Sequence, residues 1–91
     1  MNFEYDPNKS AGNKDKHGID FEEAKALWND YNRLEVPAAY RGEERIAVIG
    51  RIRAVVWTAI ITYRDDAIRI ISVRRAREKE VALYGNEGIA D

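Results

Sequence analysis

The chain has 91 residues, of which 45% are hydrophobic and 34% are charged, with a formal net charge of −1 and no cysteine. This length and apolar content are typical of one compact domain and exclude a disordered chain. The lack of cysteine excludes disulfides and thiolate metal sites, and the longest nearly apolar run, residues 54–63, is far too short to span a membrane. With no signal-peptide pattern at the start, we expect a cytoplasmic protein with one domain over residues 1–84 and a frayed tail over 85–91.

The first elements expected are a short strand over residues 3–5 and a helix. Asp6 followed by Pro7 is a favourable helix start, because Asp accepts hydrogen bonds from free backbone amides and Pro fits the first helical position. The helix should run to about Lys16 and end at Gly18, which tolerates the left-handed conformation.

A second helix is predicted from Asp20 to about Trp28. Asp20 and Glu23 have the spacing of a capping box, in which each side chain accepts from the backbone amide of the other. The apolar residues of this helix fall on one face and predict core packing; they are Phe21, Ala24, Leu27 and Trp28. A strand over residues 33–36 should follow and end at Pro37.

From residue 45 onward, β-branched and aromatic residues predict strands over residues 45–52, 55–64 and 67–73, with a turn at Asp65-Asp66. The middle strand is apolar on both faces, which indicates a central position. A helix over residues 75–84 closes the chain. The fold class is therefore α+β, with an antiparallel sheet of about four strands, two N-terminal helices and a C-terminal helix.

The positive charge is concentrated in one stretch. Residues 1–44 carry 6 basic and 10 acidic side chains, whereas residues 45–79 carry 9 and 3, and eight of those nine basic residues are arginines. Arginine presents a planar fork that suits phosphate, although charge alone fits a solvated strand face equally well. Arg74 and Arg75 stand at the expected start of the last helix, where the helix dipole disfavours cations, and this conflict favours a functional role.

The segment Lys16-His17-Gly18-Ile19 places the single histidine beside a lysine at a helix end. Histidine is the side chain that titrates near neutral pH, and the helix dipole favours its cationic form there. A lone histidine is more often structural or simply exposed, so this motif indicates little by itself. We expect no metal site and no cofactor, because there is no second histidine and the carboxylates lack ligand-like spacing.

An ordered set of motifs extends over nearly the whole chain: Tyr5 to Lys9, Asn13, Lys16 to Ile19, Phe21 to Ala24, Asp30, Glu44-Arg45, Gly50, Tyr63-Arg64, Ile68 to Ala76, Glu80 and Tyr84. The most specific pair is Lys-His-Gly-Ile followed by Arg-Ile-Ile-Ser-x-Arg-x-Ala. Taken in this order, the motifs resemble the BrnT toxin family, which implies a RelE-like fold and a ribonuclease toxin of a type II toxin–antitoxin system.

Metal-free RNA cleavage needs a group that takes the 2′-hydroxyl proton, an acid for the departing oxygen and cations that stabilise charge on the phosphate. Our hypothesis is that His17 transfers protons and that Lys16, Arg64 and Arg74 hold the phosphate. Glu44 is a weaker candidate for proton transfer. Secondary candidates for RNA binding are Tyr63, Arg69 and Arg75.

The register of the last hairpin decides whether Arg64 and Arg74 can share a site. A two-residue turn at Asp65-Asp66 alone puts Tyr63, Ser72 and Arg74 on one face of the sheet and Arg64 on the other. A three-residue turn or a bulge instead puts Thr62, Arg64, Ser72 and Arg74 together. The shared-site hypothesis predicts the second arrangement.

The main alternative is a non-catalytic nucleic-acid-binding or regulatory module that uses the same basic sheet surface, and a structural interaction protein is a third possibility. Only acid–base chemistry benefits from a group that titrates near neutral pH, so His17 discriminates between them. The resemblance implies a BrnA-type antitoxin and RNA as partners, translation inhibition as the outcome, no membrane, and DNA contact only through the antitoxin.

Overall fold

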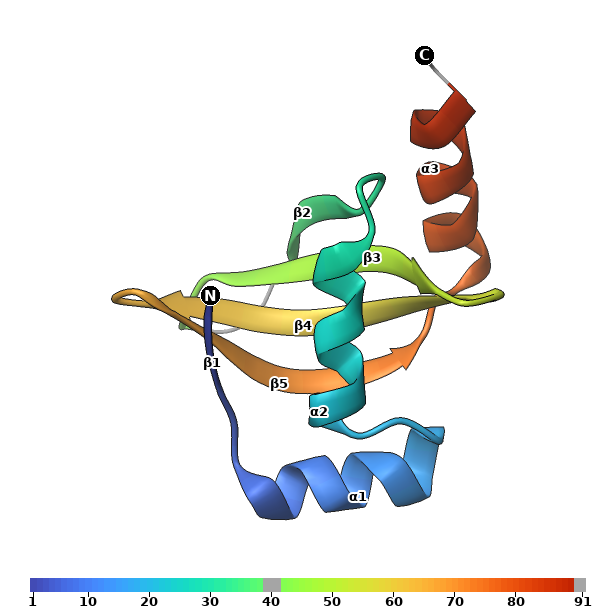
Figure 1. Cartoon of the computed structure of the whole chain (residues 1–91). Helices are drawn as coiled ribbons and strands as arrows, with labels where there is room; N and C mark the ends of the chain where they lie inside the picture. Colours follow the sequence, from blue (N-terminus) through green and yellow to red (C-terminus); the bar gives the residue numbers. More distant parts are fainter. Residues whose placement is uncertain (39–41, 90–91) are drawn as a thin grey trace.

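A computed structural model describes residues 1–38 and 42–89 and confirms the α+β class. Within them, one sheet of five strands has the order β1-β5-β4-β3-β2, with β1 parallel to β5 and the other neighbours antiparallel (Figure 1). The α2–η1 segment crosses one face of the sheet, α1 lies along the β5 side, and α3 stands at one end. The elements are β1 (Asn2–Glu4), α1 (Pro7–His17), α2 (Phe21–Ala24), the 3-10 helix η1 (Lys25–Asn29), β2 (Leu34–Ala38), β3 (Arg45–Ile52), β4 (Val55–Arg64), β5 (Ala67–Arg75) and α3 (Glu78–Ile89).

The predicted helix starts are confirmed in atomic detail. The Asp6 side chain accepts a hydrogen bond from the Asn8 amide at 2.8 Å, and Gly18 ends α1 in the left-handed conformation at φ 83°. The capping box is complete, because the Asp20 carboxylate accepts from the Glu23 amide and the Glu23 carboxylate accepts from the Asp20 amide. Local sequence alone therefore determines where both helices begin.

The core lies between the sheet and the α2–η1 segment. Phe21, Ala24 and Leu27 are buried against the facing side of the central strands, as predicted, and Trp28 packs at the margin. Gly50 lets η1 approach β3 closely, because a β carbon there would come within 3.1 Å of the Leu27 side chain. This close approach brings the end of η1 next to the end of β3.

Helix α1 is attached to β5 by the buried side chain of Asn13. Strand β1 pairs only with the first residues of β5, so the rest of that edge needs other hydrogen-bond partners. The Asn13 amide donates to the Val73 carbonyl at 2.8 Å and accepts from the Val73 amide at 3.2 Å, as a neighbouring strand would. Asn13 also donates to the Ile19 carbonyl at 2.8 Å, so the attachment extends to the chain that leaves α1.

The last hairpin contains both a two-residue turn and a bulge, which we had considered as alternatives from the sequence. Arg64 pairs with Ala67 across a two-residue turn, and a bulge then shifts the register, since Ile60 pairs with Ser72 but Ile61 pairs with Ile70. Ile71 is the extra residue. The bulge returns Ser72 and Arg74 to the face that carries Thr62 and Arg64.

Two boundaries near the C-terminus differ from the predicted ones. Arg74 and Arg75 belong to β5, where they pair with Thr58 and Trp57, so neither residue starts a helix. The expectation of a helix over 75–84 was wrong in its bounds, because β4 is long enough to keep β5 paired to its end. Helix α3 instead begins at Glu78 and continues to Ile89. No helix within residues 1–38 and 42–89 is long and apolar enough to cross a membrane.

Candidate functional site

The arginines predicted to share a phosphate lie on one face of the sheet but at its two ends. Arg64, Arg69 and Arg74 all project from the open face, which we define as the face opposite α2 and η1. Arg64 pairs with Ala67 and Arg74 with Thr58, so their positions along β4 are six residue steps apart. At the rise of a β-strand this is about 20 Å. The two arginines therefore lie on the same face, as predicted, but they are too far apart to bind the same phosphate.

The far end of the sheet, which carries the Asp65-Asp66 turn, holds its cations in ion pairs. Arg64 and Arg69 both lie near the Glu4 carboxylate, at 3.6 and 3.7 Å. Tyr63 points to the opposite face, where its hydroxyl donates to Glu35. Partial burial and this hydrogen bond raise the pKa of Tyr63 to about 12. The weaker candidate Glu44 also lies at this end, since its carbonyl accepts from Thr62.

Arg74 is held by Glu80 of α3. Two hydrogen bonds of 2.7 and 3.0 Å join the guanidinium to both carboxylate oxygens, and the Thr58 hydroxyl and the Arg77 amide donate to the same carboxylate. These donors lower the pKa of Glu80 to about 2, with the Arg74 hydrogen bonds as the largest cause. A phosphate would have to displace this carboxylate to bind Arg74 in the same way.

Lys16, His17 and Arg75 belong to chain ends that meet at the near end of the sheet, the end that carries the β3–β4 turn and α3. Helix α1 runs alongside β5, and the Asn13 link to Val73 sets the C-terminal turn of α1 beside the C-terminal end of β5 (Figure 1). Lys16 is exposed and His17 is partly buried. The guanidinium of Arg75 lies 5.7 Å from the centre of the Trp57 ring, on the helix side of the sheet.

A depression of about 470 Å³ opens beside this group. Gly18, directly after His17, forms part of its wall, and Trp57 and Arg53 form other parts. Arg53 occupies the β3–β4 turn at φ 57°, a left-handed conformation that is strained for a residue with a β carbon. The depression is thus lined by the residue after His17, by the Trp57 ring and by Arg53, and also by Glu23, whose carboxylate is paired with Lys14.

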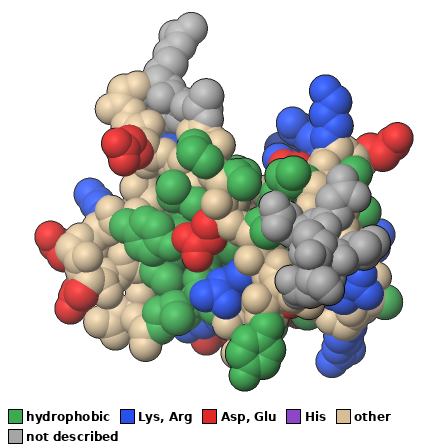
Figure 2. All heavy atoms as spheres, turned by 90° about the horizontal axis from the view of Figure 1, so that it is seen from above, with side chains coloured by type: hydrophobic (Ala, Val, Ile, Leu, Met, Phe, Trp, Pro, Cys, Tyr) green, Lys and Arg blue, Asp and Glu red, His purple; other side chains and the backbone are tan. Residues whose placement is uncertain are grey.

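Cations without an acidic partner are concentrated at the near end. Within the described part of the chain, Arg51, Arg53 and Arg75 form no ion pair within 4.0 Å, and neither does Lys16. Lys and Arg side chains project mostly on the side of the molecule that carries α3 (Figure 2). The near end therefore carries cations without an ion pair, namely Lys16, Arg53 and Arg75, beside Arg74, which is paired with Glu80, and Arg51, whose charge helps to lower the pKa of Asp30.

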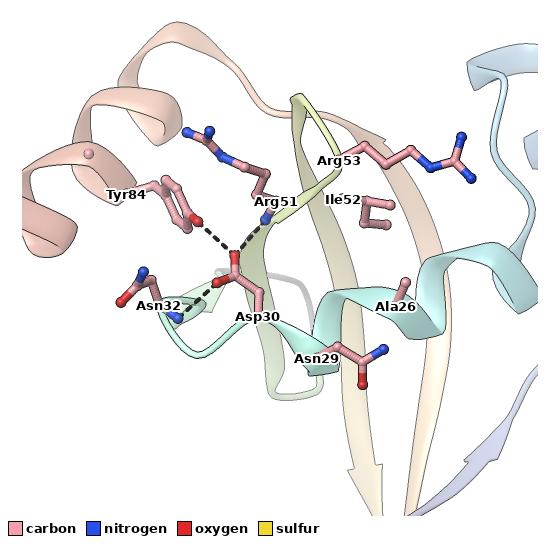
Figure 3. A pocket seen from close by; sticks show the side chains of 9 residues that line it. Ala26, Asn29, Asp30, Asn32, Arg51, Ile52, Arg53 and Tyr84 are labelled. Carbon is pink, nitrogen blue, oxygen red and sulfur yellow. Dashed lines mark hydrogen bonds between the residues drawn. The ribbon is translucent and has the colours of Figure 1, made fainter.

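Asp30 joins η1, β3 and α3 next to this group (Figure 3). Its carboxylate accepts hydrogen bonds from the Tyr84 hydroxyl at 2.7 Å, the Arg51 amide at 2.7 Å and the Asn32 amide at 2.8 Å. Burial by itself raises the pKa of Asp30, yet these hydrogen bonds keep this pKa below its usual value. The network fixes α3 against the end of β3.

Sequence reasoning did not single out Arg51, Arg53 or Trp57 as site residues. The segment Gly50-Arg51-Ile52-Arg53 before a hairpin could have indicated two of them, because it places two arginines at the same end of the sheet. Which arginines are free of carboxylates is set by tertiary neighbours. Within residues 1–38 and 42–89, no group of three or more His, Asp or Glu side chains is arranged to hold a metal ion.

A family model described as the ribonuclease toxin BrnT of a type II toxin–antitoxin system matches residues 5–80. The matched region includes Lys16, His17 and Arg75 and ends at Glu80 in the first turn of α3. No curated protein matches the sequence.

Proposed function

This chain belongs to the family of BrnT ribonuclease toxins of type II toxin–antitoxin systems, and we propose that it is an endoribonuclease that cleaves RNA with its own side chains, without a metal ion. In this reaction the 2′-oxygen attacks the neighbouring phosphorus and the 5′-oxygen of the next nucleotide leaves. The products are a 2′,3′-cyclic phosphate and a 5′-hydroxyl. One group takes the 2′-hydroxyl proton, a proton is delivered to the leaving oxygen, and cations stabilise the charge on phosphorus.

His17 is the proton-transfer group of this proposal, and Lys16 and Arg75, which belong to the same end of the sheet, are its phosphate-binding cations. The observation that carries the assignment is that the single histidine belongs to the same end of the sheet as Lys16, Arg53 and Arg75, which form no ion pair within the described residues. Arg74 lies at the same end and binds phosphate only when Glu80 releases it. Arg64 and Arg69 lie on the open face at the far end, so they can contact only a more distant part of the bound RNA, and Tyr63, which lies on the other face, has no role in this proposal.

Cleavage of a single-stranded oligoribonucleotide in the presence of EDTA tests the proposal. The wild type should cleave it, and one 2′-deoxy nucleotide on the 5′ side of the mapped linkage should stop that cut, because the attacking hydroxyl is gone. His17→Gln should slow cleavage at least about 100-fold with affinity within about twofold of wild type. An equal fall in rate and affinity would make His17 a binding residue and favour a non-catalytic module.

The family also implies an antitoxin partner, and we propose that it is of the BrnA type and that free toxin inhibits translation. Induced expression should then arrest bacterial growth and amino-acid incorporation, and coexpression of the cognate antitoxin should restore both. His17→Gln at equal abundance should leave growth normal. Arrest by both proteins would locate the toxic activity away from His17.

A further inference from the structure

A second depression adjoins the one beside Trp57 and is lined by three of the same residues, Ala26, Ile52 and Arg53. It has a volume of about 710 Å³ and lies between η1, the β3–β4 turn and α3 (Figure 3). Binding sites for small molecules usually measure about 300–1,000 Å³, so this one has room for a nucleotide. Because the two depressions share a margin, an extended chain bound at one continues directly into the other.

The η1 side of this second depression carries two side-chain amides, those of Asn29 and Asn32 (Figure 3). Both residues are exposed, and neither side chain has a hydrogen-bond partner within the described part of the protein. An asparagine side chain offers two donors and one acceptor oxygen. This is the combination that pairs with the edge of a nucleobase.

The opposite side carries positive charge and a flat surface. The guanidinium of Arg51 lies over the Tyr84 ring, 5.8 Å from its centre, and Arg53 projects from the turn between the two depressions (Figure 3). Guanidinium planes and aromatic rings are surfaces on which unpaired RNA bases stack. Three donors occupy most of the acceptor positions of the Asp30 carboxylate, two of them on one oxygen, so little of its hydrogen-bonding capacity is left for a ligand.

We infer that the second depression binds one nucleotide of a single-stranded RNA, next to the linkage on which His17 acts, and that Asn29 and Asn32 select its base. The base continues the stack of Tyr84 and Arg51, while Arg53 contacts the phosphate between the two depressions. The position relative to the cut rests on the proposed function; the binding of a nucleotide does not. An acidic peptide would use the two arginines but has no use for the two side-chain amides or a stacking surface, so the observations favour RNA.

Binding of non-cleavable probes tests this site without requiring catalysis. The probes are 2′-O-methyl oligonucleotides of adenine, cytosine and uracil, each 12 nucleotides long and labelled for fluorescence anisotropy. We expect the wild type to prefer one base. In the double variant Asn29→Ala, Asn32→Ala the affinity for that base should fall about tenfold and the preference should largely vanish. These side chains bond to nothing in the described protein, so the variant should fold normally; Asn8→Ala, an exposed asparagine on α1, is the matched control.

A preference that survives unchanged in the double variant would overturn the inference, and so would a wild type that binds all three probes equally. If Arg51→Gln, Arg53→Gln weakens binding of a ten-residue polyglutamate peptide but not of the probes, the depression is a protein-docking site and the inference fails. A wild type that prefers one base but cleaves no RNA would instead count against the proposed function alone.

Discussion

At the scale of single residues, Glu80 is the acceptor that joins the start of α3 to the sheet. Arg74, Thr58 and the Arg77 amide all donate to it, and its side chain is only 20% exposed. Glu80→Gln keeps the shape but loses the charge, and should lower the free energy of unfolding at pH 7 by roughly 2 kcal/mol. Chemical denaturation checks this value, and Glu78→Gln in the same helical turn should change it by less than about 0.5 kcal/mol.

The lowered pKa of Glu80 also predicts a dependence of stability on pH. The folded-state pKa of about 2 lies below the ordinary value of 4.5. Its contribution is therefore fully present above about pH 4.5 and is lost as the pH falls toward 2. The difference in unfolding free energy between wild type and Glu80→Gln should shrink over this window. A difference that stays constant from pH 6 to pH 2.5 would show that the Glu80 charge does not stabilise the fold.

Arg53 and Asp65 hold equivalent left-handed positions in the two hairpin turns, at φ 57° and 53°. Glycine relieves the strain of this conformation and costs some chain entropy, so each substitution to glycine should stabilise the protein by roughly 0.5–1 kcal/mol. Only Arg53→Gly should also weaken RNA binding, because only Arg53 lies in the basic near end. Thermal unfolding and anisotropy with the same RNA probe separate the two effects. Equal RNA affinities for both variants would remove Arg53 from the interface.

At the scale of elements, α1 substitutes for a missing strand. The Asn13 side chain completes the free edge of β5 at Val73 and thereby positions the helix end that carries Lys16 and His17. Asn13→Ala leaves buried backbone groups without partners and should lower the free energy of unfolding by about 2–4 kcal/mol. Hydrogen exchange of the Val73 amide should accelerate as well. Normal exchange in the folded variant would show that other contacts protect this edge.

At the scale of the whole molecule, the two ends of the sheet differ in how their arginines are paired. Arg64 and Arg69 at the far end lie near Glu4, whereas Arg53 and Arg75 at the near end form no ion pair within the described residues. The variant Arg53→Gln, Arg75→Gln should therefore reduce the slope of log affinity against log salt concentration by about 1–1.5, since each phosphate contact on a single strand contributes about 0.7. Arg64→Gln, Arg69→Gln, which leaves Glu4 unpaired, should change the slope less. Binding titrations from 50 to 300 mM salt measure both. A larger effect at the far end would reverse our placement of the RNA.

Most of the fold could be predicted because its signals are local. Helix starts at Asp6 and Asp20 depend on side chains within three residues, and the strands follow from alternating apolar residues. The order of motifs along the chain was also sufficient to indicate the family, which the match over residues 5–80 confirms. The concentration of arginine after residue 45 is likewise a property of the sequence itself.

Only the tertiary structure decided which arginines remain free. Glu4 meets Arg64 and Arg69 because β1 adds to the sheet beside β5, and Glu80 meets Arg74 because β5 runs on to Arg75 before α3 begins. The bulge at Ile71 sets the face of Arg74, and no local sequence signal marks it. Hydrophobic period and capping act between near neighbours, whereas ion pairing depends on which distant segments meet. For this reason the sequence by itself determined the elements, the family and the basic stretch, and the tertiary structure decided which of the basic side chains are ion-paired.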